Sequence, residues 1–151
     1  INSGNWASLG FALPAAVGAW GAHPDQHPLV LVGDGALLMS AIELATLARY
    51  RIPALVVVMD NAGYGTERPM LDGPFNDVAP VDHVGLALAM GFSAARRVER
   101  EGELWEALQT FLQDTEGPTL ISAALDPHDA SDALRNLTAA LGKKVRAGAQ
   151  E

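Results

Sequence analysis

Two short groups of Gly, Asp and Asn residues stand out as candidates for chemistry, at residues 33–36 and 60–63. The first, Gly-Asp-Gly-Ala, follows an apolar run, and its glycines let the backbone turn sharply and approach a ligand closely. A helix that starts there would present free N–H groups and a positive dipole end, which suit a phosphate. Asp34 supplies a carboxylate oxygen of the kind that Mg²⁺ takes as one of its few protein ligands.

The second group follows the next apolar run and offers further oxygen ligands from Asp60, Asn61 and the Gly63 carbonyl. Residues 36–59 separate Gly-Asp-Gly from Asp60, which is the length of one helix and one strand. That length returns the chain to the same edge of a parallel sheet. Either group alone is an ordinary turn, and the pairing predicts a diphosphate bound through a magnesium bridge.

The elements that position these groups alternate between strands and helices. Apolar runs predict strands at 29–32, 54–59, 93–98 and 119–124, and helical spacing predicts helices at 8–21, 37–50, 81–90, 103–114 and 131–141. Pro14 falls in the first turns of the first helix, and Ser131 or Asp129 is the expected N-cap of the last. This alternation predicts an α/β fold with three layers and a mainly parallel sheet. The connection at 61–80 is too long for a simple turn and is expected to be functional.

Composition excludes several classes of protein. The 151 residues are 49% hydrophobic and 19% charged, which indicates a globular protein, and a net charge of −8 argues against a nucleic-acid partner. No apolar stretch approaches the ~20 residues of a membrane span. The absence of cysteine excludes disulfides and fits a cytoplasmic location. Neither a G-x-G-x-x-G fingerprint nor a P-loop occurs, which disfavours a nucleotide-binding doubly wound domain.

The stretch GDGALLMSAIELATLARYRIPALVVVMDN, residues 33–61, resembles the signature of thiamine-diphosphate-dependent enzymes, which runs from GDG through a helix and a strand to an Asn pair. The preceding NWASLGFALPAAVGA also resembles this superfamily. NAGYGTERPMLDGPFNDV and DPHDASDALRNL resemble its pyruvate and indolepyruvate decarboxylase branch. The resemblance covers nearly the whole chain and identifies it as the C-terminal diphosphate-binding domain of that superfamily, with its thiamine-diphosphate-binding fold.

The resemblance implies a set of site residues. Asp34, the Asn61 side chain and the Gly63 carbonyl would bind Mg²⁺, while the N–H groups of Gly35 and Ala36 would bind the diphosphate. The Ala7 carbonyl would accept a hydrogen bond from the aminopyrimidine, and Leu9 would impose the bent shape of the cofactor. The full cofactor-binding set is Ala7, Leu9, Gly33, Asp34, Gly35, Ala36, Asn61, Gly63 and Tyr64.

The implied chemistry is decarboxylation of a 2-oxo acid to an aldehyde, with the bound cofactor as electron sink. Glu67 matches the catalytic acidic residue near the reactive carbon, where burial would keep it partly protonated. A surface ion pair with Arg68 is the alternative for this residue. Indolepyruvate, phenylpyruvate and pyruvate all remain open as substrates. An acetolactate-synthase-like carboligase and a non-catalytic domain of the same fold also remain open, although Glu67 and Phe-Asn-Asp at 75–77 favour the decarboxylase.

The resemblance also implies a partner. In this superfamily the cofactor lies between two domains, and a pyrimidine-binding domain of the same or another chain supplies a glutamate that protonates the cofactor. We therefore expect the isolated chain to be inactive and the full enzyme to be a homodimer or homotetramer. The start at Ile1 suggests either a fragment or a natural separate subunit. Residues 1–125 are expected to form the cofactor-binding domain, and residues 126–151 a C-terminal helix and tail.

Two positions depart from the family pattern. Asp60 replaces the first Asn of the usual pair, and Ala36 replaces a frequent Ser. If Asp60 faces the metal it adds negative charge near a diphosphate, whereas it is harmless if it faces a helix. The histidines are expected to be solvated or capping, and the tryptophans to lie in the core or an interface. These residues are His23, His27, His83 and His128, and Trp6, Trp20 and Trp105.

Overall fold

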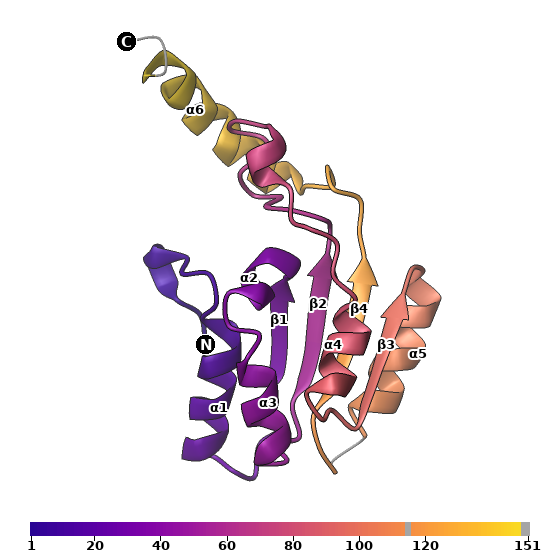
Figure 1. The fold of residues 1–151 in the computed structure, drawn as a ribbon. Coiled ribbons are helices and arrows are strands. Elements are labelled where there is room, and N and C mark those ends of the chain that lie inside the picture. Colours follow the sequence, from indigo (N-terminus) through magenta and orange to yellow (C-terminus); the bar gives the residue numbers. More distant parts are fainter. Residues whose placement is uncertain (114–115, 149–151) are drawn as a thin grey trace.

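A computed structural model describes residues 1–113 and 116–148, and the described chain is built around a four-stranded sheet. Its strands are β1 (Leu29–Gly33), β2 (Leu55–Asp60), β3 (Ala94–Val98) and β4 (Thr119–Ala124). They lie in the order β1-β2-β4-β3, and every neighbouring pair is parallel (Figure 1). In this register Gly33 lies beside Met59 and Asp60 beside Ala124, so β1, β2 and β4 end at one edge. The predicted α/β fold with a parallel sheet is confirmed.

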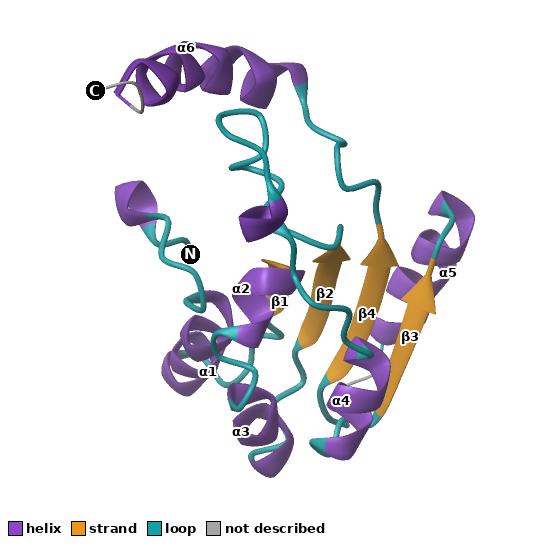
Figure 2. Cartoon of the chain, turned by 45° about the horizontal axis from the view of Figure 1, so that its top comes forward, coloured by secondary structure: helices purple, strands orange, loops and turns teal. Residues whose placement is uncertain are grey.

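The helices form a layer on each face of this sheet. One face carries α1 (Ala12–Ala22), α2 (Asp34–Leu38), α3 (Glu43–Arg49) and α4 (His83–Ala89), and the opposite face carries α5 (Glu101–Phe111) (Figure 2). The strand order explains this division. The chain advances across the sheet from β1 through β2 to β3, then steps back to β4. Because crossovers are right-handed, the step that reverses direction places its helix on the other face.

Two apolar clusters hold the layers together. On the four-helix face, Leu13, Leu44 and Leu47 of the helices pack on the strands and are completely buried. On the α5 face, Ala107 packs beside Ile121. Strands β2 and β4 are buried on both faces, and this explains why their sequences are continuous apolar runs.

Strand β1 differs from the central strands because it is one of the two outer strands of the described sheet. Val30 and Val32 are buried beneath α1, whereas Leu29 and Leu31 point to the other face and are 55% and 61% exposed. The layer on the α5 side therefore covers β3 and β4 but leaves the side chains of β1 open in the described chain.

The helix expected at 37–50 is two short helices, α2 and α3, joined by tight turns. The N–H groups of Glu43 and Leu44 bond to carbonyls three residues earlier, at 2.9 and 3.1 Å, instead of four. Such i to i−3 bonds wind the chain more tightly than an α-helix and break the axis. The prediction of one continuous helix was therefore wrong, although its apolar positions do face the core.

The last helix, α6 (Asp132–Gly148), is longer than expected, and the Ser131 hydroxyl accepts a hydrogen bond from the Leu134 N–H at 3.2 Å. This confirms Ser131 as the N-cap. The other elements lie within a few residues of their predicted ranges, and short 3₁₀ turns occur at η1 (Gly4–Trp6) and η2 (Pro74–Asn76). Residue 114, where the predicted helix of 103–114 ends, and the tail at 149–151 lie outside the described residues.

Two segments extend beyond the carboxyl ends of the strands, namely the long connection after β2 and helix α6 (Figures 1 and 2). They place side chains above the edge where β1 and β2 end. The division of the chain at residue 125 stays a prediction. In the part of the chain that the structure describes, no helix is both long and apolar enough to span a membrane.

Candidate functional site

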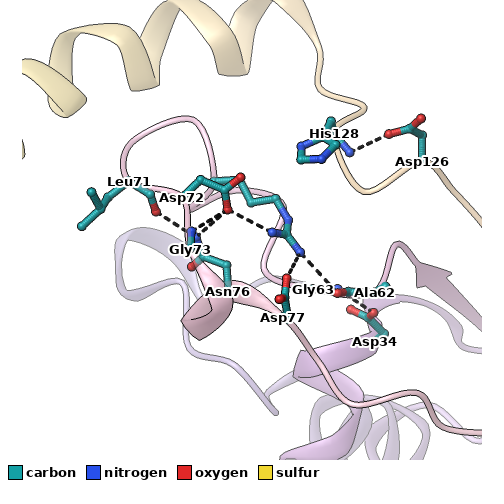
Figure 3. Close-up of polar contacts among 11 residues, drawn as sticks. Asp34, Ala62, Gly63, Leu71, Asp72, Gly73, Asn76, Asp77, Asp126 and His128 are labelled. Atoms are coloured by element: carbon teal, nitrogen blue, oxygen red, sulfur yellow. Dashed lines mark hydrogen bonds and ion pairs between the residues drawn. The ribbon is translucent and has the colours of Figure 1, made fainter.

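The carboxylate of Asp34 joins the two groups that the sequence singles out. Asp34 follows β1 directly, is only 2% exposed, and accepts a hydrogen bond from the Gly35 N–H at 2.7 Å through Oδ1. Its Oδ2 accepts a second bond from the N–H of Gly63 at 3.0 Å, across from the end of β2 (Figure 3). Burial raises the pKa of Asp34 above its ordinary value, because desolvation disfavours the ionised form.

The Asn61 side chain completes a group of converging oxygens. Its amide oxygen faces the Gly63 carbonyl oxygen at 2.8 Å and Asp34 Oδ1 at 3.3 Å. No hydrogen separates these three acceptors, so they repel one another in the absence of a cation. Half a turn of the amide would instead let its NH₂ donate to both oxygens.

This donor set fits a magnesium ion. Mg²⁺ takes oxygen ligands, usually with one or two carboxylates, and fills its shell with phosphate and water. Asp34, Asn61 and Gly63 offer one carboxylate, one amide oxygen and one carbonyl. Among the described residues there is no cluster of three His, Asp or Glu side chains, so this site differs in type from an all-protein metal cage.

Close packing around the site explains two of its glycines. A Cβ atom at Gly35 would lie 2.6 Å from Cε1 of Tyr64, so the Tyr64 ring packs directly on the turn after β1. A Cβ at Gly65 would lie 2.5 Å from Nδ2 of Asn61 and would push that amide out of place. A side chain at either position would therefore displace a neighbouring side chain of the site.

The Arg68 guanidinium folds the connection after β2 back on itself. Arg68 donates to Asp72 at 3.0 Å, to Asp77 at 2.8 Å and to the Ala62 carbonyl at 3.4 Å. Gly63 also forms an isolated antiparallel bridge with Asp77. These contacts bind both ends of the segment together and fix the backbone that carries the Gly63 carbonyl.

Asn76 closes the same loop from within. It is 4% exposed, and its amide donates to the Leu71 carbonyl at 2.8 Å, while its own carbonyl accepts from the Tyr64 N–H at 2.8 Å. Hydrogen bonds from Asn76, and then from Arg68, lower the pKa of the Asp72 carboxyl. The expectation that this long connection is functional gains a structural basis, because its ordered core holds the Gly63 turn in position.

The turn itself is strained at Ala62. This residue has φ of +56°, in the left-handed region that is unfavourable for residues with a Cβ. Ala62 lies between Asn61 and Gly63, so its strained backbone conformation sets the relative orientation of both candidate ligands. Strain of this kind persists only where the surrounding contacts hold the backbone in the unfavourable conformation.

A cleft of about 340 Å³ lies over this edge of the sheet. Its walls include most of the predicted cofactor-binding residues, namely Leu9, Gly33, Asp34, Gly35, Ala36, Asn61, Gly63 and Tyr64. Met59, Leu125, Asp129 and Leu134 also line it, and sequence analysis did not assign them to the site. Asp129 and Leu134 fall in the segment DPHDASDALRNL, so its resemblance to the decarboxylases was the available signal.

Two predicted residues lie outside the cleft walls in the described chain. Ala7 is exposed in the N-terminal segment, with φ of +45°. Glu67 is also exposed and lies in a turn of the loop after β2, so the described chain does not itself supply the burial expected around this residue, and its catalytic role stays a prediction. The alternative of an ion pair with Arg68 is not what the loop forms, because the described partners of Arg68 are Asp72 and Asp77.

His83 also differs from expectation. It begins α4 but is 4% exposed rather than solvated, and its Nδ1 lies 3.6 Å from Oδ2 of Asp60. The reason is that α4 packs its first turn over the sheet edge instead of turning it to solvent. Of the tryptophans, Trp6 and Trp105 are exposed by 88% and 64%, while Trp20 is partly buried against the four-helix face.

Comparison with known proteins agrees with this geometry. The family described as thiamine pyrophosphate enzyme, C-terminal TPP binding domain, matches residues 1–123. A pyruvate decarboxylase of Neurospora crassa is 34% identical over 133 residues, which are 85% of this chain and 23% of that protein. An alpha-keto-acid decarboxylase of Mycolicibacterium paratuberculosis is 36% identical over 124 residues, which are 80% of this chain and 22% of the relative. The chain thus spans less than a quarter of the length of these relatives.

The match covers both strands that end at the cleft, the turn after each strand and the four helices on that face. Thiamine pyrophosphate, also called thiamine diphosphate, carries the diphosphate group that the paired turns were predicted to bind. The chain therefore belongs to the thiamine pyrophosphate enzymes and comprises their C-terminal TPP-binding domain, homologous to that of pyruvate and alpha-keto-acid decarboxylases.

Proposed function

We propose that this chain forms the diphosphate- and Mg²⁺-binding part of a thiamine-diphosphate-dependent decarboxylase of 2-oxo acids. The observation that carries the proposal is the convergence of three oxygens, from Asp34, Asn61 and Gly63, at the edge where β1 and β2 end. The turned amide would satisfy these acceptors without a metal, whereas a bound Mg²⁺ would favour the orientation in which the Asn61 amide oxygen faces Asp34 and Gly63. The names of the relatives, pyruvate decarboxylase and alpha-keto-acid decarboxylase, support the reaction class.

Each site residue has a defined task in this proposal. Asp34, Asn61 and the Gly63 carbonyl would hold Mg²⁺, and the N–H groups of Gly35 and Ala36 would bind the diphosphate. Tyr64 and Gly33 would contact the cofactor from the cleft walls, and Leu9, half exposed there, would support it from below. When bound, thiamine diphosphate supplies the carbon nucleophile and the electron sink for decarboxylation.

Ala7 and Glu67 would act only with a partner. The Ala7 carbonyl would accept a hydrogen bond from the aminopyrimidine, and Glu67 would exchange a proton near the reactive carbon. Both are exposed in this chain, so these roles need a second surface that closes over them and excludes water. A pyrimidine-binding domain, from the same polypeptide or another, would provide that surface, and the greater length of the relatives supports its existence.

The complete enzyme would be a cytoplasmic homodimer or homotetramer that acts on a 2-oxo acid such as indolepyruvate, phenylpyruvate or pyruvate. The lack of cysteine is compatible with that location. In this arrangement the chain would bind the diphosphate end of the cofactor, and the partner domain would enclose the ring end.

A calorimetric titration tests the binding step. The chain is titrated with thiamine diphosphate with and without Mg²⁺, beside an Asp34→Ala variant. We expect weak binding that requires Mg²⁺ and disappears in the variant. Equal binding by both proteins would refute the assignment of the metal ligands, and detectable decarboxylation by the pure chain would refute the need for a partner domain.

A product assay tests the reaction class. The complete polypeptide, with its pyrimidine-binding domain, is incubated with pyruvate, phenylpyruvate and indolepyruvate in separate reactions. A decarboxylase releases the aldehyde, whereas a carboligase of the acetolactate-synthase type releases an acetohydroxy acid from pyruvate. Exclusive formation of the acetohydroxy acid would replace the proposed reaction while leaving the cofactor site unchanged.

A further inference from the structure

A second polar cluster lies beside the cofactor site, centred on the carboxylate of Asp60. Its Oδ2 accepts hydrogen bonds from Nη1 of Arg97 and, at 3.2 Å, from the hydroxyl of Ser122. Nδ1 of the buried His83 lies 3.6 Å from the same oxygen, beyond hydrogen-bond distance. The Asp60 side chain is 16% exposed, so the contact with Arg97 balances a charge that is largely removed from water.

The cluster crosses three strands. Asp60 is the last residue of β2, Ser122 lies on β4, and Arg97 lies on β3 directly beside Ser122 in the parallel register. The guanidinium therefore reaches across β4 to fix the Asp60 carboxylate beneath α4. Successive side chains of an extended chain point to opposite sides. With Asp60 held on the α4 side, the next residue, Asn61, turns its amide toward Gly63 and Asp34.

The charge of Asp60 lies beside the metal site, because Asp60 ends β2 and directly precedes the candidate ligand Asn61. A second carboxylate so close to a diphosphate repels it unless a cation balances the charge. Arg97 is the cation in contact with Asp60, and its side chain is half exposed.

We propose that Arg97 is a positioning residue of the cofactor site. It holds the Asp60 carboxylate away from the diphosphate and thereby directs Asn61 toward the metal. The inference rests on the proposed function, since it concerns the same site. It also assigns a use to the Asp that replaces the family's first Asn, because this chain carries a charged residue there together with the Arg that balances it.

The test compares three variants. Arg97→Met removes the charge and keeps the length of the side chain. Arg96→Met is the matched control, since Arg96 is the preceding residue of the same strand, is exposed, and points to the opposite face. The double variant Asp60→Asn/Arg97→Met removes both charges and leaves an amide that can still pair with Ser122. Circular dichroism identifies the conditions in which every variant is folded.

Under those conditions each protein is titrated with thiamine diphosphate at saturating Mg²⁺. We expect Arg97→Met to bind about tenfold more weakly, as a nearby unbalanced charge would cause. Arg96→Met and the double variant should bind within about threefold of the parent chain. A merely structural ion pair would change unfolding and leave the affinity of the folded protein alone. Unchanged affinity in Arg97→Met, or a double variant as weak as Arg97→Met, overturns the proposal.

Amide hydrogen exchange without cofactor separates this inference from the proposed function. The Gly63 N–H, which is bonded to Asp34, should exchange faster in Arg97→Met, relative to amides of β4, and recover in the double variant. If the parent chain binds thiamine diphosphate, the titration decides whether Arg97 is a positioning residue. If the parent chain does not bind it, the proposed function fails and the exchange of the Gly63 N–H decides instead. In that case, exchange in Arg97→Met at the rate of the parent chain overturns the positioning role.

Discussion

Oδ2 of Asp34 and the backbone N–H of Gly63 are joined by a hydrogen bond of 3.0 Å that links the turns after two neighbouring strands. Through this bond the buried carboxylate of Asp34 fixes the backbone of Gly63, a candidate metal ligand, at the edge of the sheet. A carboxylate in this position is costly when ionised without a cation. The cofactor-free chain is therefore expected to carry a pH-dependent weakness that binding of Mg²⁺ removes.

Replacement of Asp34 by Asn should remove this pH-dependent loss of stability, and comparison with the parent chain then measures it. Because burial raises the folded-state pKa of Asp34, the folded state binds more protons than the unfolded state between the two pKa values. The parent chain should therefore lose stability relative to Asp34→Asn as the pH rises from about 4 through the raised pKa. The slope of this difference is at most about 1.4 kcal/mol per pH unit.

Urea unfolding of the cofactor-free proteins at a series of pH values measures this difference. Asp25→Asn serves as the control, because Asp25 is exposed in the turn before β1. An Asp34→Asn difference that follows the Asp25→Asn difference at every pH would mean that burial does not perturb the Asp34 carboxyl.

Gly65→Ala should impair metal-dependent binding without unfolding the chain. The new methyl group would lie 2.5 Å from the Asn61 amide nitrogen, so the amide must leave the position that it holds beside Gly63 and Asp34. We expect Mg²⁺-dependent affinity for thiamine diphosphate to fall by about tenfold or more, the cost of a lost charge-assisted contact. Gly18→Ala, where the added Cβ meets no atom within 4 Å, should leave affinity unchanged. Equal affinities for the two variants would contradict the role given to Asn61.

Ala62→Asn should stabilise the chain. Ala62 has φ of +56°, and Asn tolerates this region better than Ala does, so relief of strain should add up to about 1 kcal/mol to the unfolding free energy. Ala19→Asn, in the middle of α1, should instead destabilise by roughly 0.5 kcal/mol. Chemical denaturation of both variants gives the two signs directly. Destabilisation by Ala62→Asn would show that the side chain at 62, and not its backbone, is what the turn requires.

Arg68→Met should loosen the loop after β2. The variant leaves Asp72, Asp77 and the Ala62 carbonyl without their shared donor. Local opening should then be more frequent, and chymotrypsin should cut after exposed Phe75 or Leu71 several-fold faster than in the parent chain. Arg49→Met on α3 provides the control for a lost surface charge. Cleavage at the parent rate in Arg68→Met would mean that Asn76 alone holds the loop.

The fold and the centre of the site could be predicted because both follow from local pattern and topology. Buried parallel strands such as β2 and β4 are continuous apolar runs, and their order in the chain with intervening helices fixes a parallel sheet. The carboxyl ends of β1 and β2 must then meet at one edge, which brings Asp34 beside Gly63. No side-chain detail was needed for this step.

Features that depend on packing between distant segments could not be predicted. The burial of His83 arises from where the first turn of α4 packs, and the break between α2 and α3 arises from tight turns within an otherwise helical pattern. Asp129 and Leu134 line the cleft because the chain after β4 rises above the sheet edge, a path that periodicity does not encode. The exposure of Glu67 likewise depends on what covers its loop.

The open side of β1 has a practical consequence for anyone who purifies this chain. Leu29 and Leu31 are more than half exposed on an outer strand of the described sheet. An uncovered strand edge with apolar side chains is a template on which further chains can pair. Concentrated solutions should therefore develop light scattering with time, and a lysine at position 31 should delay it, because residue 31 does not line the cleft at the carboxyl edge of the sheet.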